Sequence, residues 1–264
     1  MATRFNILCI GDIVGRPGRE VLARVLPHLK KEHAADFVIA NGENASGGCG
    51  LLPKNADEIY ASGVDVITLG DHTWDKPEVN TLWEKTENLV RPYNFPPGAL
   101  GRGVTVVKAA NGHMVAVINM MGRTFMKYQL DCPFRAVDNI LNDLDPNVKI
   151  RVIDFHAETT SEKNAFGVYT DGRVSAVFGT HTHIQTADAR IFPQGTAFIT
   201  DLGMTGPYDS VIGQNKDKIL KRFLTSLPQK FEVAADDPMV CGALIVVDTA
   251  TGKALSITNI AQRG

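Results

Sequence analysis

An apolar run near the start of the chain, FNILCI at residues 5–10, is followed directly by Gly11 and Asp12. A short continuous apolar run of this kind is typical of a β-strand buried on both faces. Two further runs, DFVIA at 36–40 and VDVITL at 64–69, repeat the pattern and are also followed by polar or glycine residues. Helical patterns separate the three runs, and this βαβαβ order predicts a parallel sheet.

The segments between and after these runs are expected to be helices. Residues 18–33 have helical periodicity, although Pro27 is expected to kink or split the helix. Residues 53–62 form a second helix, with Pro53 at its first position, where the missing N–H is not needed. A shorter helix is expected at 76–85.

The middle and end of the chain contain a mixed set of elements. Two β runs at 103–108 and 113–119 flank Asn111-Gly112, which is a strong signal for a hairpin. The further elements expected are helices at 133–144 and 215–226 and strands at 149–155, 173–178, 196–200, 231–235 and 242–258, the last with a turn at Thr251-Gly252. No linker or repeat divides the sequence. We therefore expect one domain over residues 1–264, of the α/β class, with two mixed sheets and helices outside them.

Composition and charge exclude several classes of protein. The 264 residues carry 27 basic and 29 acidic side chains, a net charge of −2 and 44% hydrophobic residues. The apolar share is enough for a full core, and the charge gives no general attraction for nucleic acid or anionic membranes. The four cysteines are far apart with no CxxC pair, which favours a reducing cytoplasm. The first apolar run reaches Asp12 too soon for a signal peptide, and no apolar run approaches the length of a membrane span.

Polar side chains capable of chemistry follow five of the expected strands. In open α/β sheets, ligands bind in the crevice beyond the carboxyl ends of the strands. The sequence therefore predicts that one set of candidates meets at one edge of the structure: Asp12, Glu43, Asn44, Asp71, His72, His156, His181 and His183. Four of the seven histidines belong to this set, whereas the other three lie within an expected helix or hairpin.

Each of these residues also has an ordinary structural explanation. Asp12 alone is most simply a helix cap, and Asn41-Gly42 is compatible with simple turn chemistry. A lone histidine such as His156 is more often hydrogen-bonded than a ligand. His181 and His183 are a stronger signal, because residues i and i+2 of an extended chain project to the same face. The joint placement of the whole set after parallel strands favours a metal site.

The ligand types restrict the metal and the reaction. Carboxylate, amide oxygen and imidazole suit manganese, iron or zinc, and no cysteine is among the candidates. Seven groups are too many for one ion but suit two ions that share a bridging carboxylate. Two ions are the usual device for displacement at phosphorus, because one generates a hydroxide at neutral pH and both hold phosphoryl oxygens. His72 directly follows a candidate ligand, so its side chain points elsewhere and suits a general acid or a clamp on developing charge.

The order of these motifs resembles that of the calcineurin-like metallophosphoesterases, and in particular their bacterial YmdB-like branch. The motifs are, in chain order, Asp12, Asn41-Gly42-Glu43-Asn44, Gly70-Asp71-His72 with Asp75, His156, and Gly179-Thr180-His181-Thr182-His183. The resemblance runs along nearly the whole chain and includes the segments 46–48, 159–163 and 201–207. It implies a four-layer α/β/β/α sandwich, two metal ions and phosphodiesterase activity, and members of the branch are associated with 2′,3′-cyclic nucleotides.

The resemblance also implies a role for each candidate residue. One ion would be held by Asp12, Asn44 and His183 and the other by Asp71, His156 and His181, with Glu43 bridging them and His72 as the catalytic imidazole. Iron or manganese is the expected metal, with zinc or magnesium as alternatives.

Two positions depart from the pattern of the wider family. Asp71 stands where the family generally carries asparagine. An aspartate still ligates through oxygen, and its negative charge is expected to tighten metal binding and to weaken the Lewis acidity of the site slightly. Val14 stands two residues past Asp12, where a histidine is usual, as is expected in this branch. Ligation there is left to Asp12, Glu43 and Asn44.

Three functions are compatible with the sequence. The first is a dinuclear phosphodiesterase for small phosphodiesters such as 2′,3′-cyclic nucleotides. The second is a phosphomonoesterase, for example a nucleotidase, which would use the same metals. The third is a regulatory metal-binding protein that recruits RNA or a protein partner. A homo-oligomer is compatible with each of them.

The sequence indicates the residues that contact the substrate less clearly than it indicates the metal ligands. Arg16, Arg19 and the backbone amides of Gly47-Gly48 are candidates for binding a substrate phosphate. The glycines that follow the first strand do not form the G-x-G-x-x-G motif of dinucleotide-binding folds. In such a fold, Asp12 would also place a carboxylate where the pyrophosphate lies, so dinucleotide binding is set aside.

Overall fold

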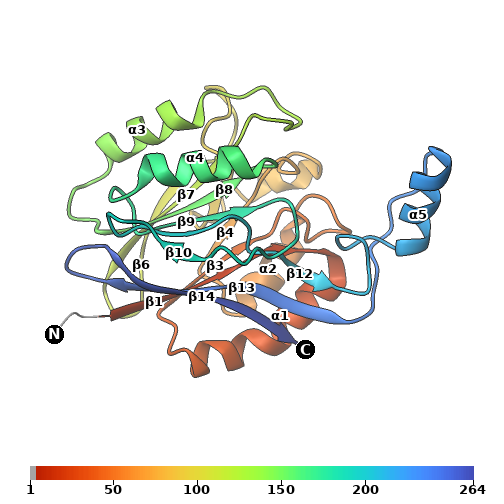
Figure 1. The fold of residues 1–264 in the computed structure, drawn as a ribbon, viewed down its shortest axis with the longest axis horizontal. Coiled ribbons are helices and arrows are strands. Elements are labelled where there is room, and N and C mark those ends of the chain that lie inside the picture. Colours follow the sequence, from red (N-terminus) through yellow and green to blue (C-terminus); the bar gives the residue numbers. More distant parts are fainter. Residues whose placement is uncertain (1–3) are drawn as a thin grey trace.

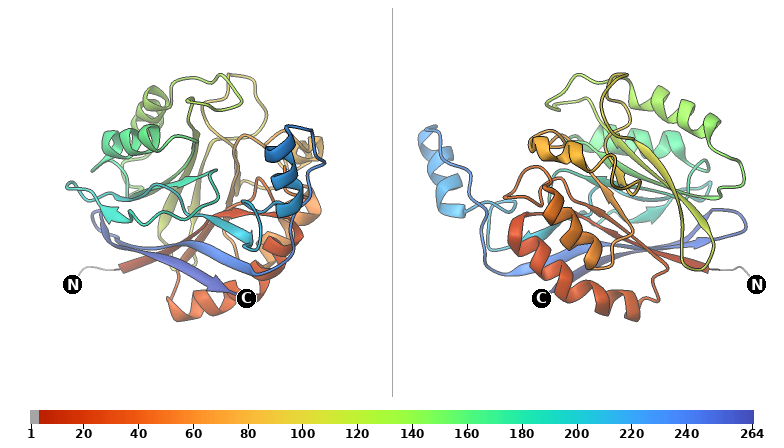
Figure 2. Two further views of the ribbon diagram at one scale, coloured as in Figure 1. Left: turned by 45° about the vertical axis from the view of Figure 1, so that its right-hand side comes forward. Right: turned by 180° about the vertical axis from the view of Figure 1, so that it is seen from behind.

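The computed structural model describes residues 4–264 and has four layers. Two β-sheets are stacked face to face, and helices cover the outer face of each (Figures 1 and 2). Helices α1 (Gly15–Glu32) and α2 (Pro53–Ala61) lie on one side, and α3 (Pro133–Asp143) and α4 (Thr160–Thr170) lie on the other. The expected α/β/β/α sandwich of two mixed sheets is therefore confirmed. Residues 1–3 of the N-terminal segment considered for a signal peptide lie outside the described residues.

The first sheet combines parallel and antiparallel strands. Its parallel part is the predicted βαβαβ unit extended by one short strand: β1 (Arg4–Ile10), β3 (Phe37–Asn41), β4 (Val66–Thr68) and β5 (Leu89–Val90). The rest of this sheet comes from the end of the chain and two short segments: β13 (Pro238–Asp248), β14 (Ala254–Arg263), β12 (Met204–Pro207) and β2 (Asp12–Ile13). Strand β13 runs antiparallel to β1, so the two ends of the chain are joined in one sheet.

The second sheet comes from the middle of the chain. Its order is β10 (Arg190–Ile191), β11 (Ala197–Ile199), β9 (Ala176–Thr180), β8 (Ile150–His156), β7 (Met114–Met121) and β6 (Val104–Lys108). Strands β6 and β7 form the predicted antiparallel hairpin, and β7, β8, β9 and β11 are parallel. The carboxyl ends of β8 and β9 therefore lie at the same edge of this sheet.

Three apolar cores separate the four layers, which explains why the strands are apolar on both faces. In β1, Phe5 and Ile7 belong to the core between the two sheets, while Leu8 and Ile10 belong to the core beneath α1 and α2. In β8, Phe155 belongs to a third core beneath α3 and α4. Burial of each such side chain contributes roughly 1.5–3 kcal/mol.

Several predicted elements differ from those observed. Pro27 neither splits nor ends α1, because it lies on the exposed side of the helix, where the carbonyl that loses its partner can face water. The helix expected at 76–85 is only a 3₁₀ turn, η1 (Pro77–Thr81), and the strand expected at 231–235 is reduced to one bridge between Gln214 and Val233. Helix α4 has no sequence signal, because its buried positions include Lys163 and Gly167 instead of an apolar stripe.

Helix α5 (Lys216–Thr225) fulfils the prediction of an amphipathic helix, but the rest of residues 4–264 does not cover its apolar side. It projects from the body of the molecule as an arm, and none of its residues is buried (Figures 1 and 2). Its apolar side chains are exposed, with Phe223 at 79% and Leu224 at 83% of their full accessibility. The local pattern therefore predicted the helix correctly but not its surroundings.

Candidate metal centre

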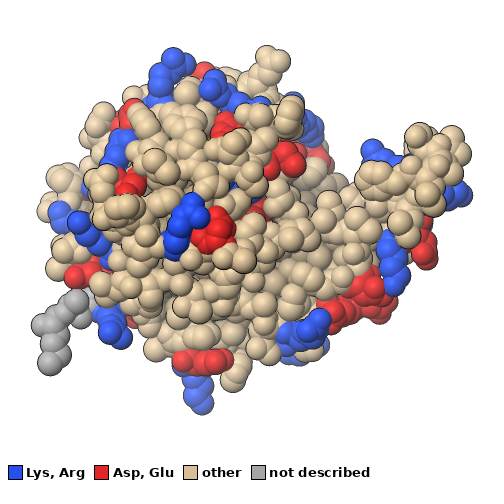
Figure 3. All heavy atoms as spheres, viewed as in Figure 1, with Lys and Arg blue, Asp and Glu red and all other residues tan. Residues whose placement is uncertain are grey.

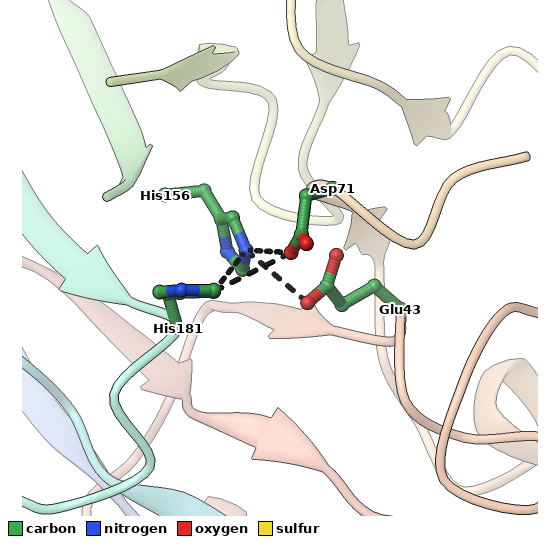
Figure 4. A group of neighbouring side chains, drawn as sticks. All are labelled: Glu43, Asp71, His156 and His181. Atoms are coloured by element: carbon green, nitrogen blue, oxygen red, sulfur yellow. Dashed lines mark hydrogen bonds and ion pairs between the residues drawn. The ribbon is translucent and has the colours of Figure 1, made fainter. Parts of the chain in front are cut away.

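Four charged or ionisable side chains converge where β3, β4, β8 and β9 end (Figure 4). One ligand atom from each of Glu43, Asp71, His156 and His181 lies within 4.8 Å of the others. The Nε2 atom of His156 is at the centre, 3.2 Å from Glu43 Oε1, 3.1 Å from Asp71 Oδ1 and 3.1 Å from His181 Nδ1. The two sheets therefore bring together residues that are up to 138 positions apart in the sequence.

The charges in this cluster depend on each other. Burial disfavours the charged form of His156, but the carboxylates of Glu43 and Asp71 raise its pKa well above the usual value. Burial also works against ionisation of Asp71, yet its bonds with His156 and His181 lower its pKa. Carboxylates held against imidazoles in this way form a site whose anionic groups a cation can also neutralise.

Gly70 makes room for the cluster. A Cβ atom at this position would lie 2.3 Å from Glu43 Oε2 and 2.4 Å from His156 Nε2. Any side chain at position 70 would therefore displace two of the four groups, which explains why the residue before Asp71 is glycine.

A second set of groups lies next to this cluster. The Oδ2 atom of Asp12 accepts a hydrogen bond from the backbone N–H of His181 at 3.2 Å, and Asp12 Oδ1 lies 3.8 Å from His183 Nε2. The Nδ1–H of His183 donates to the carbonyl of Ile212 at 2.9 Å, which leaves Nε2 free to act as a ligand. The structure therefore places Asp12 and His183 together.

Two buried oxygens in this second set have no hydrogen-bond partner among the described residues: Asp12 Oδ1 and Asn44 Oδ1. The amide group of Asn44 donates to the carbonyl of Gly48 at 3.1 Å, which fixes the direction of its oxygen. An unsatisfied buried oxygen costs about 1–3 kcal/mol, so these two oxygens require an explanation. A hard or borderline cation fits this donor set of carboxylate, amide oxygen and imidazole.

The loop that carries His181 and His183 is strained and firmly held. Both residues have positive φ angles, of 99° and 64°, which are unfavourable for residues with a side chain. The ammonium group of Lys163 donates to the carbonyl of Thr180 at 2.8 Å and to Asp201 at 2.7 Å. Since Lys163 and Asp201 are both fully buried, this ion pair anchors the loop from beneath.

His72 lies beside the cluster, and its backbone N–H donates to Glu43 Oε2 at 3.0 Å. Its Nδ1 atom is 2.7 Å from Asp75 Oδ2, and Lys127 donates to the other oxygen of Asp75 at 3.1 Å. Burial opposes the charged form of His72, but Glu43, Asp71 and Asp75 raise its pKa above the usual value. A protonated imidazole held by a carboxylate is suited to donate a proton or to bind an anion.

A cavity of about 260 Å³ opens over these groups. Its walls include Glu43, Asn44, His72, His181 and His183. The cavity thus joins both sets of candidate ligands and the candidate catalytic imidazole.

The predicted phosphate contacts are placed less favourably. Gly48 lines the cavity, but Arg16 and Arg19 do not. Arg16 is bonded to Glu20 on the exposed surface, and Arg19 is bonded to Glu58 and to the carbonyl of Ala45. Arg16 is therefore held on α1 and Arg19 between α2 and the loop at Ala45, so we correct the expectation that they reach the substrate.

A family model described as "YmdB-like protein" matches residues 8–260. The chain belongs to the YmdB-like family. The motifs quoted from the sequence predicted this membership, and the match confirms it.

Relatives of this YmdB-like chain are similar over nearly their whole length. It is 51% identical to the 2′,3′-cyclic-nucleotide 2′-phosphodiesterase of Bacillus subtilis over 255 residues, which cover 97% of this chain and 96% of the relative. The structure matches that of a phosphatase from Mycoplasma pneumoniae with a TM-score of 0.93 at 35% identity, covering 100% of this chain and 95% of that one. A hypothetical protein from Thermus thermophilus matches with a TM-score of 0.92 at 40% identity, covering 98% and 99% of the two chains. The expectation of a phosphoesterase enzyme is confirmed by these matches.

The YmdB-like structure also contains site residues that the sequence reasoning missed. Glu158 lines the cavity, with Oε2 3.1 Å from His181 Nε2. Asp154 lies beneath His156, and burial raises its pKa to about 6. Lys163 and Asp201 lie in the family segments 159–163 and 201–207, but the sequence indicated no role for either. Only the proximity of Glu158 and Asp154 to His156 in the sequence could have suggested them.

Proposed function

We propose that this chain is a dinuclear, metal-dependent phosphodiesterase for small phosphodiesters, with 2′,3′-cyclic nucleotides as the substrate class. The observation that carries the proposal is the pair of adjoining ligand sets in one cavity, one of them with two unsatisfied buried oxygens. The name of the Bacillus subtilis relative supports the substrate class.

The residues divide between two cations as follows. Asp71, His156 and His181 would hold one, Asp12, Asn44 and His183 would hold the other, and Glu43 would lie between them. Iron or manganese suits this set of oxygen and imidazole ligands, and zinc or magnesium is an alternative. Two cations in such a site activate water and neutralise the charge on a phosphoryl group.

The chain's own residues supply the remaining steps. His72, held by Asp75, donates a proton to the oxygen that leaves phosphorus. The small cavity favours a compact phosphodiester over a long polymer. Glu158 lies at the wall beside His181, where it limits how an anionic substrate enters.

Two measurements test this proposal. Protein purified without added metal is analysed for its elements, and Mn²⁺-loaded protein is assayed with a chromogenic phosphodiester and with 2′,3′-cyclic AMP. Two equivalents of metal and hydrolysis of both compounds are expected. Protein without metal that also fails to bind added Mn²⁺ would overturn the proposal.

A phosphomonoesterase is the second candidate, because the structurally similar Mycoplasma pneumoniae protein is described as a phosphatase. Rates on a phosphomonoester and on a phosphodiester, measured with the same protein, distinguish the two. A clear preference for the monoester would reverse the order of the candidates.

The setting of the enzyme is also part of the proposal. The four cysteines form no disulfide within residues 4–264, which supports a reducing cytoplasm. Across the same residues, no helix has the length and apolar character needed to cross a membrane. We treat the whole chain as one domain.

A homo-oligomer is proposed on the basis of α5. Contiguous exposed apolar side chains mark interaction surfaces, and α5 exposes Leu220, Phe223 and Leu224 together. The arm has four basic residues and one acidic residue in a chain of net charge −2, so the rest of the chain is acidic. The net charge of the rest of a second copy is therefore opposite to that of the arm. Light scattering after gel filtration tests this, and a monomer at micromolar concentration would contradict it.

A further inference from the structure

A buried polar group lies on the side of His156 that faces away from the cavity. Asp154, two residues earlier on β8, sits beneath the cluster, and Thr180 ends the neighbouring strand β9. Asn41 and Thr68 reach the same place from the first sheet. All four side chains are fully buried.

The hydrogen bonds of Asp154 come from neutral donors. Its carboxylate accepts from Asn41 Nδ2 at 3.1 Å, from the hydroxyl of Thr68, and from the hydroxyl of Thr180 at 2.6 Å. A carboxylate with three donors around it is satisfied as an acceptor. It is therefore a fixed acceptor for the single hydroxyl proton of Thr180.

The direction of the next bond follows from this one. Thr180 Oγ1 lies 2.9 Å from His156 Nδ1. Because the hydroxyl proton of Thr180 points to Asp154, the Thr180 oxygen must accept from His156, so Nδ1 carries a proton. The opposite ring nitrogen, Nε2, then faces Glu43 and Asp71.

We propose that Thr180 and Asp154 are positioning residues that keep a proton on His156 Nδ1 and hold the ring so that Nε2 faces the ligand cluster. The proposal rests on the proposed function in one respect, because that function makes His156 Nε2 a metal ligand. Groups that orient a ligating histidine typically change metal affinity 10–100-fold when they are removed. The same bonds also join the two sheets, so an effect on stability alone does not identify the role.

The test compares three threonine variants. Thr180→Val keeps the shape of the side chain and removes the hydroxyl, while Thr180→Ser keeps the hydroxyl. Thr170→Val is the matched control, because Thr170 is equally buried but donates its hydroxyl to the carbonyl of Phe166 within α4. Each metal-free protein is titrated with Mn²⁺. We expect Thr180→Val to weaken Mn²⁺ binding about 10–100-fold, with Thr180→Ser and Thr170→Val remaining close to the parent chain.

A second readout is independent of metal. The proton on His156 Nδ1 is observed by NMR as a slowly exchanging downfield signal, which is identified by its loss in His156→Gln. We expect this signal in the parent chain, in Thr180→Ser and in Thr170→Val, but not in Thr180→Val. If Thr180→Val does not fold, Asp154→Asn is measured in the same two ways, with the same weakening and the same loss expected.

Two outcomes would overturn the proposal. One is a Thr180→Val protein that keeps both the Nδ1–H signal and the Mn²⁺ affinity. The other is a Thr180→Ser protein as impaired as Thr180→Val, because packing and not the hydroxyl would then matter. A parent chain that binds no Mn²⁺ but shows the Nδ1–H signal would contradict the proposed function and leave this arrangement of His156 supported.

Discussion

At the carboxyl edge of the two sheets, charged side chains are buried, whereas on α5 apolar side chains are exposed. Glu43, Asp71 and His156 are buried, and both carboxylates lie within 3.2 Å of the His156 imidazole. Phe223 and Leu224 on the arm remain largely exposed to water within residues 4–264. Both regions reverse the usual distribution of residue types, which is expected where a protein binds something.

The surface between these regions shows the ordinary case. Basic and acidic side chains are interspersed over the face shown in Figure 3, and neither sign of charge dominates that face. The carboxyl edge of the sheets and α5 therefore differ in the kind of partner that their side chains would bind. In the proposed function cations bind at the edge of the sheets, whereas the proposed oligomer covers the apolar side of the arm.

Removal of a ligand at the edge of the sheets should have the largest effect. Glu43→Gln keeps the shape but removes the charge of the carboxylate that we propose to lie between the two cations. Because changes in groups that only support a ligand cost 10–100-fold, we expect Mn²⁺ affinity and kcat/KM to fall by more than about 100-fold. Metal titration and steady-state kinetics check this, with Glu20→Gln on the exposed face of α1 as the control. Unchanged metal content would place Glu43 outside the metal site.

Substitution of His72 should separate chemistry from metal binding. His72→Gln leaves the four clustered groups intact, so we expect kcat on a phosphodiester to fall about 10²–10⁴-fold while two equivalents of metal are retained. Elemental analysis and kinetics on the same preparation check this. A loss of metal in parallel with activity would show that His72 supports the ligands instead.

The buried ion pair beneath the histidine loop should matter for stability. Lys163→Met leaves Asp201 buried without its partner, and we expect the free energy of unfolding to fall by about 3–5 kcal/mol. Lys216→Met is the matched control, because Lys216 pairs with Asp209 on the surface and its loss should cost at most about 1 kcal/mol. Urea denaturation of both variants measures the difference. An equal decrease in the free energy of unfolding of both variants would show that the buried pair stabilises the protein no more than the exposed pair does.

Substitution on the arm should have the smallest effect within one chain. The double variant Phe223→Ser with Leu224→Ser removes exposed apolar side chains, so we expect unchanged metal content and a change in Tm of no more than a few degrees. If α5 contacts a second copy, the same variant should shift the oligomer toward monomer in light scattering. An unchanged oligomer would move the interface away from α5.

Much of the site was predictable because of the regularity of parallel sheets. The polar residues after the apolar runs at 5–10, 36–40 and 64–69 were expected to meet at one edge, and the structure brings Glu43, Asp71, His156 and His181 together there. The supporting residues were not predictable. Lys163 and Asp201 meet across 38 positions, and no local pattern encodes such a pair.

The sequence by itself determined the apolar strands, the hairpin at Asn111-Gly112, the types of ligand available and the family. Each of these depends on local periodicity or on motif order, which the chain carries without folding. The tertiary structure alone decided that β13 runs beside β1, that Asp154 and Thr180 lie beneath His156, and that α5 stands free. The physical reason is that burial and hydrogen-bond direction depend on neighbours brought from distant parts of the chain. An amphipathic segment such as α5 specifies a helix but not the surface that covers it.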